Sequence, residues 1–482
     1  MPASTTSYEP VIGLEVHVQL ATRTKIFCGC LVSFGAEPNT QVCPTCLGLP
    51  GALPVLNAEA VRLALVAATA LGCEVPRRSV FARKQYFYPD LPKGYQISQF
   101  DRPLALGGGV VLEATNDAPE KHIHLERIHM EEDAGKSLHG GREGSRIDLN
   151  RAGVPLVEIV SKPEVTSANE AARYLKALHE VLVALGVTDG NMEQGSFRCD
   201  ANVSVRPVGT TEFGERVEIK NVNSFRFVER AIEYEIARQT MVLEEGQRVV
   251  RETRGWDEDR GLTYSQRTKE LSDDYRYFPD PDLPALAIPE EEVARVRQAL
   301  PELPRAKRTR YVAEHGFSSQ LARTLTQTVE TSAFFEASAA RTKDPLRLAN
   351  FFVTEVLKDA TVEGAALAFP VRPEQLAELV DLVHEGAISG KQAKELYLAL
   401  RGSTEGARER ASALGMTQLS DAGAIDAVVA EVIAENARQA ESLKAGKVAL
   451  LGFFVGQVMK KTSGRANPKM VEQALKAALG LP

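Results

Sequence analysis

A cluster of prolines divides this chain of 482 residues into two parts of different character. Proline breaks helices and sheets alike, so a dense group of prolines marks a boundary between domains. The sequence before the cluster is rich in short strand-like runs with turns between them, whereas the sequence after it has the Ala, Leu, Glu and Lys content of helices. The prolines are Pro279, Pro281, Pro284, Pro289, Pro301 and Pro304.

The N-terminal part alternates between apolar and polar residues, as half-buried strands do. Positions 14, 16 and 18 are apolar and positions 15, 17 and 19 are polar, which predicts a strand over residues 10–20. Strand-like runs interrupted by helical patterns favour an α+β fold with an extended, mostly antiparallel β-sheet. We predict further strands at 154–160 and 201–206 and helices at 59–71, 167–185 and 225–245.

Chain length predicts about three domains, at roughly 100–200 residues per domain. We expect a large N-terminal sheet domain over residues 1–295 and an all-α helical domain over residues 296–408. A second break, at residues 402–406 with the sequence Gly-Ser-Thr-Glu-Gly, precedes a small all-α tail domain over residues 409–482. The tail helices are predicted at 421–439, 442–460 and 468–479.

The net charge of the chain is mildly acidic but unevenly distributed. Lys and Arg number 57 and Asp and Glu 64, a difference of −7, and aromatic residues make up only 6%. These values exclude a generally basic nucleic-acid-binding chain and a large stacking surface for single strands. Residues 444–482, however, carry seven basic residues and one acidic residue, a net charge of +6. This segment is either a nucleic-acid backbone contact or a solvated helix face, and charge alone leaves both open.

The sequence indicates a soluble, cytoplasmic protein with no membrane partner. The N-terminus lacks a basic start followed by an apolar core, so it does not resemble a signal peptide. The longest apolar candidate, residues 63–73, is too short to cross a bilayer and is typical of a buried helix.

Four of the six cysteines form two close pairs, Cys28 with Cys30 and Cys43 with Cys46. Two such pairs on two turns can bring four thiolates together, which suits tetrahedral Zn²⁺. Because four thiolates close the coordination sphere, the zinc would be structural. The alternative is two disulfides or free thiols. The cysteines at positions 73 and 199 are predicted to be lone buried thiols.

Several carboxylates and one histidine lie within strand-like runs. A carboxylate in an apolar strand is costly unless it is paired or bound to a metal. Together these residues could form an oxygen-rich site for Mg²⁺ and nucleotide phosphates, although each alone could face solvent on the open side of a half-buried sheet. They are Glu15, His17, Glu131, Glu132, Asp133, Glu158, Asp200 and Glu218.

None of the common nucleotide-binding loops is present. The tripeptide at residues 135–137, Gly-Lys-Ser, resembles the end of a phosphate-binding loop, but the glycine required five positions earlier is replaced by Met130. A second segment, residues 83–98, combines four aromatic residues with Lys84 and Lys93 and is either a functional loop or an exposed aromatic turn.

Long motifs along the chain together resemble one protein family, the B subunit of the tRNA-dependent amidotransferase that acts on aspartyl- and glutamyl-tRNA. The similarity runs from about residue 8 to the C-terminus. The motifs lie at residues 11–19, 84–93, 95–99, 129–136, 148–151, 195–202, 273–280 and 452–460.

This resemblance implies an enzyme that corrects misacylated tRNA. Glu-tRNA(Gln) would become Gln-tRNA(Gln), and Asp-tRNA(Asn) would become Asn-tRNA(Asn). The B subunit would use ATP and Mg²⁺ to phosphorylate the side-chain carboxylate on the tRNA, and ammonia would then displace the phosphate. The implied partners are an A subunit that releases ammonia from glutamine, a small C subunit that completes a heterotrimer, and the tRNA. The synthetase that misacylates the tRNA is a further candidate partner.

The resemblance also implies roles for individual residues. Four residues match a pocket for Mg and ATP: Glu15, His17, Glu131 and Glu158. Glu132 matches a position at the mouth of an ammonia tunnel, Lys84 and Lys93 match residues near the tunnel and the nucleotide, and Asp200 is carried over as a further catalytic residue. The four cysteines, which the family does not always have, are all present, so the zinc expectation stands. The helical segment 296–405 and the YqeY-like tail would hold the tRNA.

Two rival interpretations belong to other functional classes. A non-catalytic tRNA-binding scaffold would not need Glu15, His17, Glu131 and Glu158 to converge. A zinc-dependent hydrolase would need an open coordination position on the zinc.

Overall fold

The computed structural model describes residues 7–139, 144–268, 275–363, 366–416, 422–444, 447, 450–462, 466 and 468–481. Contacts divide the chain into two compact units, Met1–Leu303 and Pro304–Pro482. Among the described residues, no helix combines the length and the apolar character needed to cross a membrane.

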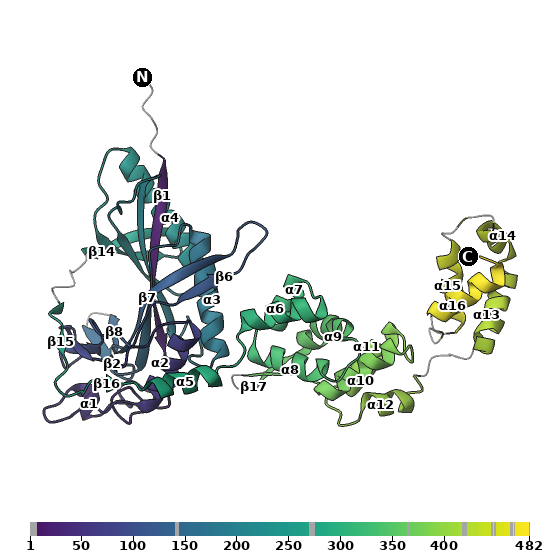
Figure 1. Ribbon diagram of the computed structural model, residues 1–482, viewed down its shortest axis with the longest axis horizontal. Helices are drawn as coiled ribbons and strands as arrows, with labels where there is room; N and C mark the ends of the chain where they lie inside the picture. Colours follow the sequence, from purple (N-terminus) through teal and green to yellow (C-terminus); the bar gives the residue numbers. More distant parts are fainter. Residues whose placement is uncertain are drawn as a thin grey trace, which may run out of the picture. The chain divides into compact units, whose positions relative to one another are not determined.

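A nine-stranded sheet forms the centre of the first unit (Figure 1). Its order is β14-β13-β12-β11-β1-β10-β7-β5, with β6 paired to β7. Every pair is antiparallel except β12 with β13, which is parallel. The predicted α+β class with a mostly antiparallel sheet is therefore confirmed. The strands are β1 (Tyr8–Gln19), β5 (Ala105–Leu106), β6 (Gly109–Leu112), β7 (Lys121–Glu132), β10 (Pro155–Ser161), β11 (Phe197–Pro207), β12 (Val217–Val222), β13 (Glu252–Asp257) and β14 (Leu262–Thr268).

The two faces of this sheet differ because side chains alternate along each strand. Leu14, Val16 and Val18 on β1 are fully buried and belong to one apolar cluster. Side chains of α2 (Ala58–Ala70), α3 (Ala168–Ala184) and α4 (Phe225–Glu244) join the same cluster. The other face carries His17 of β1, Glu131 of β7, Glu158 of β10 and Asp200 of β11.

Polar caps fix where the three helices begin. Asn57 accepts hydrogen bonds from the first turn of α2, Ser167 from Glu170 N at the start of α3, and Ser224 from Phe227 N at the start of α4. Such caps satisfy backbone donors that have no partner inside the helix. The predicted helices thus agree with the observed ones to within one residue at each end.

Small sheets and loops lie at one end of the large sheet. A three-stranded sheet of order β15-β3-β4 carries the loop 86–94 between β3 and β4. The cysteine-containing insert includes the single turn of α1. These elements are α1 (Pro44–Leu47), β2 (Arg78–Ser79), β3 (Ala82–Gln85), β4 (Tyr95–Ser98), β8 (Lys136–His139), β9 (Ser145–Asp148), β15 (Phe278–Pro279), β16 (Leu286–Ala287) and α5 (Glu290–Ala299).

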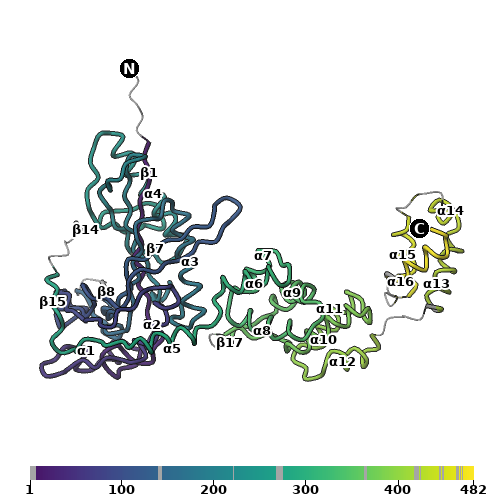
Figure 2. The backbone as a smooth tube through the Cα atoms, in the orientation of Figure 1, coloured from purple at the N-terminus to yellow at the C-terminus, as the bar shows by residue number. Residues whose placement is uncertain are grey.

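The second unit is helical, as predicted, apart from one short hairpin of β17 and β18 (Figure 2). Its described residues form two apolar clusters, one from Tyr311 to Ala411 and one from Ile425 to Leu479. Its elements are α6 (Pro304–His315), α7 (Ser319–Leu325), α8 (Val329–Ala339), α9 (Pro345–Phe351), the π-helical turn η2 (Phe352–Val356), the 3₁₀ turn η3 (Leu357–Asp359), β17 (Thr361–Glu363), β18 (Ala366–Ala368), α10 (Pro373–His384), α11 (Gly390–Leu400), α12 (Ala407–Ala413), α13 (Ala422–Glu435), α14 (Ala437–Lys444), α15 (Leu450–Lys461) and α16 (Pro468–Leu479).

The division into three domains stays a prediction. Its first boundary, 295/296, falls within α5, and its second, 408/409, falls within α12. Ala407 and Ala411 of α12 are buried in the cluster that begins at Tyr311. The tail helix predicted over 421–439 is divided between α13 and α14.

Candidate functional site

Four cysteine sulfurs gather in the insert that precedes α2. Those of Cys28, Cys30, Cys43 and Cys46 all lie within 4.8 Å of one another. The Sγ atom of Cys46 is 3.5 Å from that of Cys28, 3.7 Å from that of Cys43 and 3.9 Å from that of Cys30. A disulfide needs about 2.05 Å, so all four are free thiols.

These distances fit a tetrahedral zinc ion. With Zn–S bonds of about 2.3 Å, neighbouring sulfurs of a tetrahedron lie about 3.8 Å apart. The hydrogen bond from Cys28 and, against the effect of burial, the positive charge of Lys25 lower the pKa of the Cys46 thiol, which favours the thiolate that a metal requires. The cluster could therefore hold a structural zinc, as the spacing predicted.

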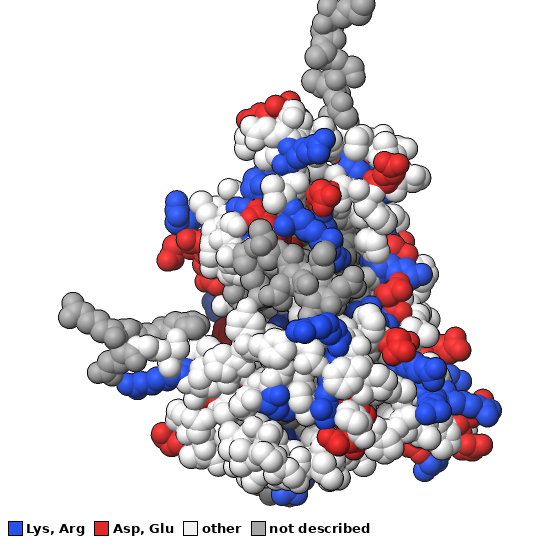
Figure 3. Space-filling model, turned by 90° about the vertical axis from the view of Figure 1, so that its left-hand side faces the viewer, with Lys and Arg blue, Asp and Glu red and all other residues white. Residues whose placement is uncertain are grey.

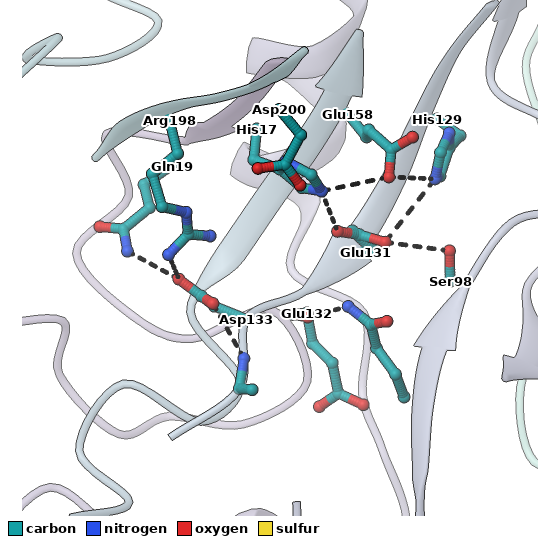
Figure 4. A network of polar contacts seen from close by, with 12 residues as sticks. His17, Gln19, Ser98, His129, Glu131, Glu132, Asp133, Glu158, Arg198 and Asp200 are labelled. Carbon is teal, nitrogen blue, oxygen red and sulfur yellow. Dashed lines mark hydrogen bonds and ion pairs between the residues drawn. The ribbon is translucent and has the colours of Figure 1, made fainter. Parts of the chain in front are cut away.

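A second group of possible ligands lies on the polar face of the large sheet. His17 is opposite Glu158 in the pairing of β1 with β10, and Leu156 of β10 is opposite Glu131 of β7. The ligand atoms of His17, Glu131 and Glu158 lie within 4.8 Å of one another (Figure 4). His17 Nε2 is 3.2 Å from Glu158 Oε2 and 3.7 Å from Glu131 Oε1.

Burial distinguishes these carboxylates from ordinary solvent-facing ones. Glu131 is 2% exposed and Glu158 is 8% exposed, so the solvent-facing alternative is wrong for both. His129, on the same face of β7, lies with its Nε2 3.6 Å from an oxygen of each carboxylate. Ser98 of β4 donates a hydrogen bond of 3.2 Å to Glu131 Oε2. Each buried carboxylate therefore has the Nε2 atoms of two histidines beside it.

Protonation in this group follows from mutual pairing. Burial works to lower the pKa of His17, but the hydrogen bond and charge of Glu158, with the charge of Glu131, raise it to about 9. Burial works to raise the pKa of Glu131, but the hydrogen bond from His129 and the charge of His17 lower it. The charges of His129 and His17 likewise outweigh burial and hold the pKa of Glu158 well below its usual range.

Lys84 contributes a positive charge from β3. Burial works to lower its pKa, but the nearby Tyr277, Glu131 and Glu158 raise it. Its Nζ atom also lies 4.7 Å from the ring centre of Tyr275. The structure thus brings this lysine within electrostatic reach of the two carboxylates.

Glu15, two residues before His17 on β1, and Asp200 on β11 lie beside this ligand group but are not part of it. They are opposite each other in the pairing of β1 with β11. Asn202 Nδ2 donates to Glu15 Oε1 at 2.9 Å, and Lys220 Nζ forms a 2.7 Å salt bridge with Asp200 Oδ2. The charge of Asp200 acts on His17, so it belongs to the surroundings of the group.

Glu132 points away from Glu131, because adjacent residues on a strand face opposite sides. Its carboxylate accepts a hydrogen bond of 2.6 Å from Lys93 Nζ and one of 2.7 Å from Ile97 N. Both side chains of the ion pair are buried, with 9% exposure for Lys93 and 3% for Glu132. The two residues suggested by the motifs therefore form one buried ion pair.

Asp133 anchors the end of β7. It accepts hydrogen bonds from Gln19 Nε2 at 2.9 Å and Arg198 Nη1 at 3.0 Å (Figure 4). Arg151 Nε lies 3.7 Å from the same oxygen. Burial works to raise the pKa of Asp133, but the charges of Arg198 and Arg151 lower it. This cluster fixes the chain directly after Glu131 and Glu132.

The donor set fits one divalent cation. Two buried carboxylates suit the preference of Mg²⁺ for few protein oxygens together with phosphates and water. An ion bound here would displace the proton that Glu158 and Glu131 hold on His17, and the freed imidazole nitrogen is a ligand that Mn²⁺ accepts more readily than Mg²⁺. His17, Glu131 and Glu158 would hold this ion.

Several residues of the site received no role from the sequence alone. His129 lies two positions before Glu131, the same spacing as Glu15 and His17, and this repeat was the available signal. Ser98, Lys220 and Arg198 had no comparable signal, because their contacts cross between strands that are distant in sequence.

The side of the first unit that carries α1 and β15 is shown in Figure 3. Lys, Arg, Asp and Glu are interspersed on its upper part; the middle of its lower part is largely uncharged, with charged side chains along the edges. Exposed apolar side chains are common in the insert and in the loop 86–94. They are Leu31, Phe34, Leu49, Leu53, Val55, Phe87 and Tyr88.

Two family models match the chain. The GatB/GatE catalytic domain matches residues 10–294, and the GatB domain matches residues 333–479. A relative from Myxococcus xanthus (strain DK1622) is 51% identical over 482 residues, with 100% of both chains covered. One from Geotalea uraniireducens (strain Rf4) is 52% identical over 473 residues, covering 97% of this chain and 98% of the relative. Both are named as the B subunit of an aspartyl/glutamyl-tRNA(Asn/Gln) amidotransferase.

The chain belongs to this family. The resemblance found in the motifs is therefore confirmed, and the enzyme class is an amidotransferase, a ligase. The designation of the relatives as the B subunit of an amidotransferase implies partner chains in the same enzyme. All proposed ligands and charged residues of the two candidate sites lie within the GatB/GatE catalytic domain match.

Proposed function

We propose that the chain is the B subunit of a glutamine-hydrolysing, tRNA-dependent amidotransferase that converts Glu-tRNA(Gln) to Gln-tRNA(Gln) or Asp-tRNA(Asn) to Asn-tRNA(Asn). The names of the relatives support these substrates. The observation that carries the proposal is the convergence of His17, Glu131 and Glu158 on the polar face of the sheet. Burying two carboxylates destabilises the folded protein, and a scaffold that only binds tRNA does not need two such groups.

The proposed reaction has two steps. A side-chain carboxylate is a poor acyl donor, because its leaving group would be an oxide. The γ-phosphoryl group of ATP first passes to a carboxylate oxygen of the aminoacyl group, which gives an acyl phosphate and ADP. Ammonia then forms the C–N bond while the C–O bond to phosphate breaks, and a proton is lost to give the amide.

Phosphoryl transfer depends mainly on positioning and on compensating charge. Bound at His17, Glu131 and Glu158, Mg²⁺ would offset the negative charge of the phosphates. Lys84 adds a fixed positive charge beside the two carboxylates. Asp200 and Glu15 remain proposed members of the wider site, in which Lys220 and Asn202 hold their side chains.

Glu132 and Lys93 are proposed to control the arrival of ammonia. Both oxygens of Glu132 accept hydrogen bonds from Lys93 and Ile97 while the pair is closed. Opening the pair would free this carboxylate. We therefore assign the pair to gating or to the removal of a proton from ammonium.

The ammonia would come from an amidase A subunit, and a small C subunit would complete a heterotrimer in the cytoplasm. The structural zinc would brace the insert and would not take part in catalysis. The net charge of +6 over residues 444–482 supports tRNA binding by the tail, because neutralised phosphates dominate such affinity. Part of this charge is already paired, since Lys461 contacts Glu431 and Glu435.

The decisive experiment replaces Glu131 with Gln in the complete complex. This change keeps the shape of the side chain and removes one ligand charge. We expect tRNA-dependent ATP hydrolysis to fall to background while hydrolysis of glutamine by the partner chain continues. Glu193→Gln, at an exposed position, is the matched control and should behave like wild type. Normal ATP turnover by Glu131→Gln would reject the kinase assignment and favour the scaffold.

A further inference from the structure

A buried lysine lies against the cysteine cluster, and its charge has no role in the reaction proposed above. Lys25 is 0% exposed. Its Nζ atom donates to Gln41 O at 2.8 Å, to Leu149 O at 3.3 Å and to Cys46 Sγ at 3.4 Å. The insert and the segment 149–153 therefore meet at one ammonium group.

The position of Lys25 is fixed by backbone contacts on both sides. Its own N–H donates to Cys30 O at 3.0 Å, and the next residue, Ile26, donates to Gly153 O at 2.9 Å. Gly153 has a φ of +85°, and an added Cβ there would lie 3.4 Å from Lys25 Cδ. The aliphatic part of the Lys25 side chain thus lies close to Gly153, a position whose backbone conformation favours glycine.

A buried ammonium group needs a nearby negative charge. Within the part of the chain that the structure describes, no carboxylate lies within salt-bridge distance of Lys25. Its remaining acceptors are two neutral carbonyl groups and a sulfur. Four thiolates, in turn, carry two more negative charges than one zinc ion compensates. The ammonium group and the cluster are therefore complementary in charge.

The segment 149–153, which accepts a hydrogen bond from Lys25 through Leu149 O, is hydrogen-bonded to the chain that follows Glu131 and Glu132. Arg151 donates to Ala134 O at 2.7 Å and to Gly135 O at 2.9 Å. Gly153 N donates to Asp133 O at 2.9 Å. These bonds connect the segment 149–153 to the end of β7, directly after Glu131 and Glu132.

We propose that Lys25 is a positioning residue for zinc: it compensates the charge of the four-thiolate site and fastens the loaded insert to the segment 149–153. This role rests on zinc being the ion of the cluster. Removing an outer partner of a metal ligand typically lowers metal affinity roughly 10- to 100-fold. Lys25→Met keeps the length of the side chain and removes its charge, so we expect a loss of zinc affinity of that size.

The test measures zinc affinity of the full chain by competition with a chromophoric chelator. Lys176→Met, at an exposed position on α3, is the control and should bind zinc like wild type. Cobalt substitution adds a spectroscopic measurement: loss of the N–H···S bond in Lys25→Met should shift the sulfur-to-cobalt charge-transfer band to longer wavelength. Equal zinc affinity and an unchanged cobalt spectrum would overturn the proposal. A wild-type chain that takes up no zinc would overturn the zinc assignment and this role with it, without affecting the amidation chemistry.

A second comparison remains informative if Lys25→Met alone does not fold. It uses a background in which all four cysteines are replaced by serine, so that Lys25 has lost its counter-charge. Adding Lys25→Met to this background should raise the melting temperature, because it removes an uncompensated buried charge. A lower melting temperature would show that Lys25 acts only through packing, and would overturn the proposal.

Discussion

The buried pair of Lys93 and Glu132 makes a quantitative prediction about stability. Both side chains are at most 9% exposed, and the shorter of their contacts is 2.5 Å. Removing one partner of a buried pair leaves an uncompensated charge, which costs about 3–5 kcal/mol. We therefore expect Lys93→Met to lower the free energy of unfolding of the first unit by about that amount. Glu132 keeps its bond from Ile97 N, so the lower half of this range is favoured.

The double variant Lys93→Met/Glu132→Gln separates charge from packing. Replacing a buried ion pair by uncharged groups is often close to neutral, so the double variant should recover most of the lost stability. Arg62→Met is the matched control, because it breaks an ion pair with Glu59 of similar length, 2.6 Å, whose side chains are about half exposed. Exposed pairs contribute about 0–1 kcal/mol.

The assay is urea unfolding followed by the fluorescence of the single tryptophan. Trp256 lies on β13, 6% exposed and within the main apolar cluster, so its signal reports on the first unit. The reasoning would be refuted if Lys93→Met cost no more than Arg62→Met. It would also be refuted if the double variant were as unstable as the sum of its single changes, since the two charges would then act independently.

Two further outcomes test other parts of the structure. Arg198 and Arg151 lower the pKa of Asp133, so the stability that its charge contributes is present above about pH 4, the ordinary value, and is lost as pH falls through the lower folded value. Asp133→Asn should therefore be less stable than wild type at neutral pH and should lose less stability on acidification. Parallel acid-denaturation curves for the two proteins would contradict this. Deleting residues 417–482 removes the tail but keeps α12 with the apolar cluster that it joins. The deletion should weaken tRNA binding and reduce the slope of log affinity against log salt by about 0.7–0.9 for each lost phosphate contact. An unchanged affinity would rule out tRNA binding by the tail.

The alternation of residues was sufficient to predict much of the sheet. Positions 14, 16 and 18 of β1 did become core, and positions 15 and 17 did fall on the polar face. Cysteine spacing was equally informative, because two short pairs on turns leave little freedom in where four sulfurs go. Local patterns of this kind can be read from the sequence because they depend only on residues that are close together in the chain.

Contacts between distant segments could not be predicted in the same way. The pairing of β11 with β12, which has a shift in register between Cys199 and Ala201, determines that Lys220 reaches Asp200. Nothing in the spacing of either strand indicates this shift. Likewise, Glu132 is adjacent to Glu131 in sequence, yet its burial depends on Lys93 and Ile97 from the β3–β4 region. Glu131 and Glu132 are the same residue type, so their different roles follow from which residues of neighbouring strands each side chain contacts.

The alternation along β1 also constrains how this protein can change over time. The same strand supplies Leu14, Val16 and Val18 to the core and His17 to the ligand group, with opposite faces used by successive residues. Inserting or deleting a single residue here would turn the carboxylate-facing histidine inward and an aliphatic side chain outward, so folding and chemistry would fail together. Length variation among related chains should therefore be concentrated in the connecting loops, and β1, β7 and β10 should keep a constant length even where their sequences diverge.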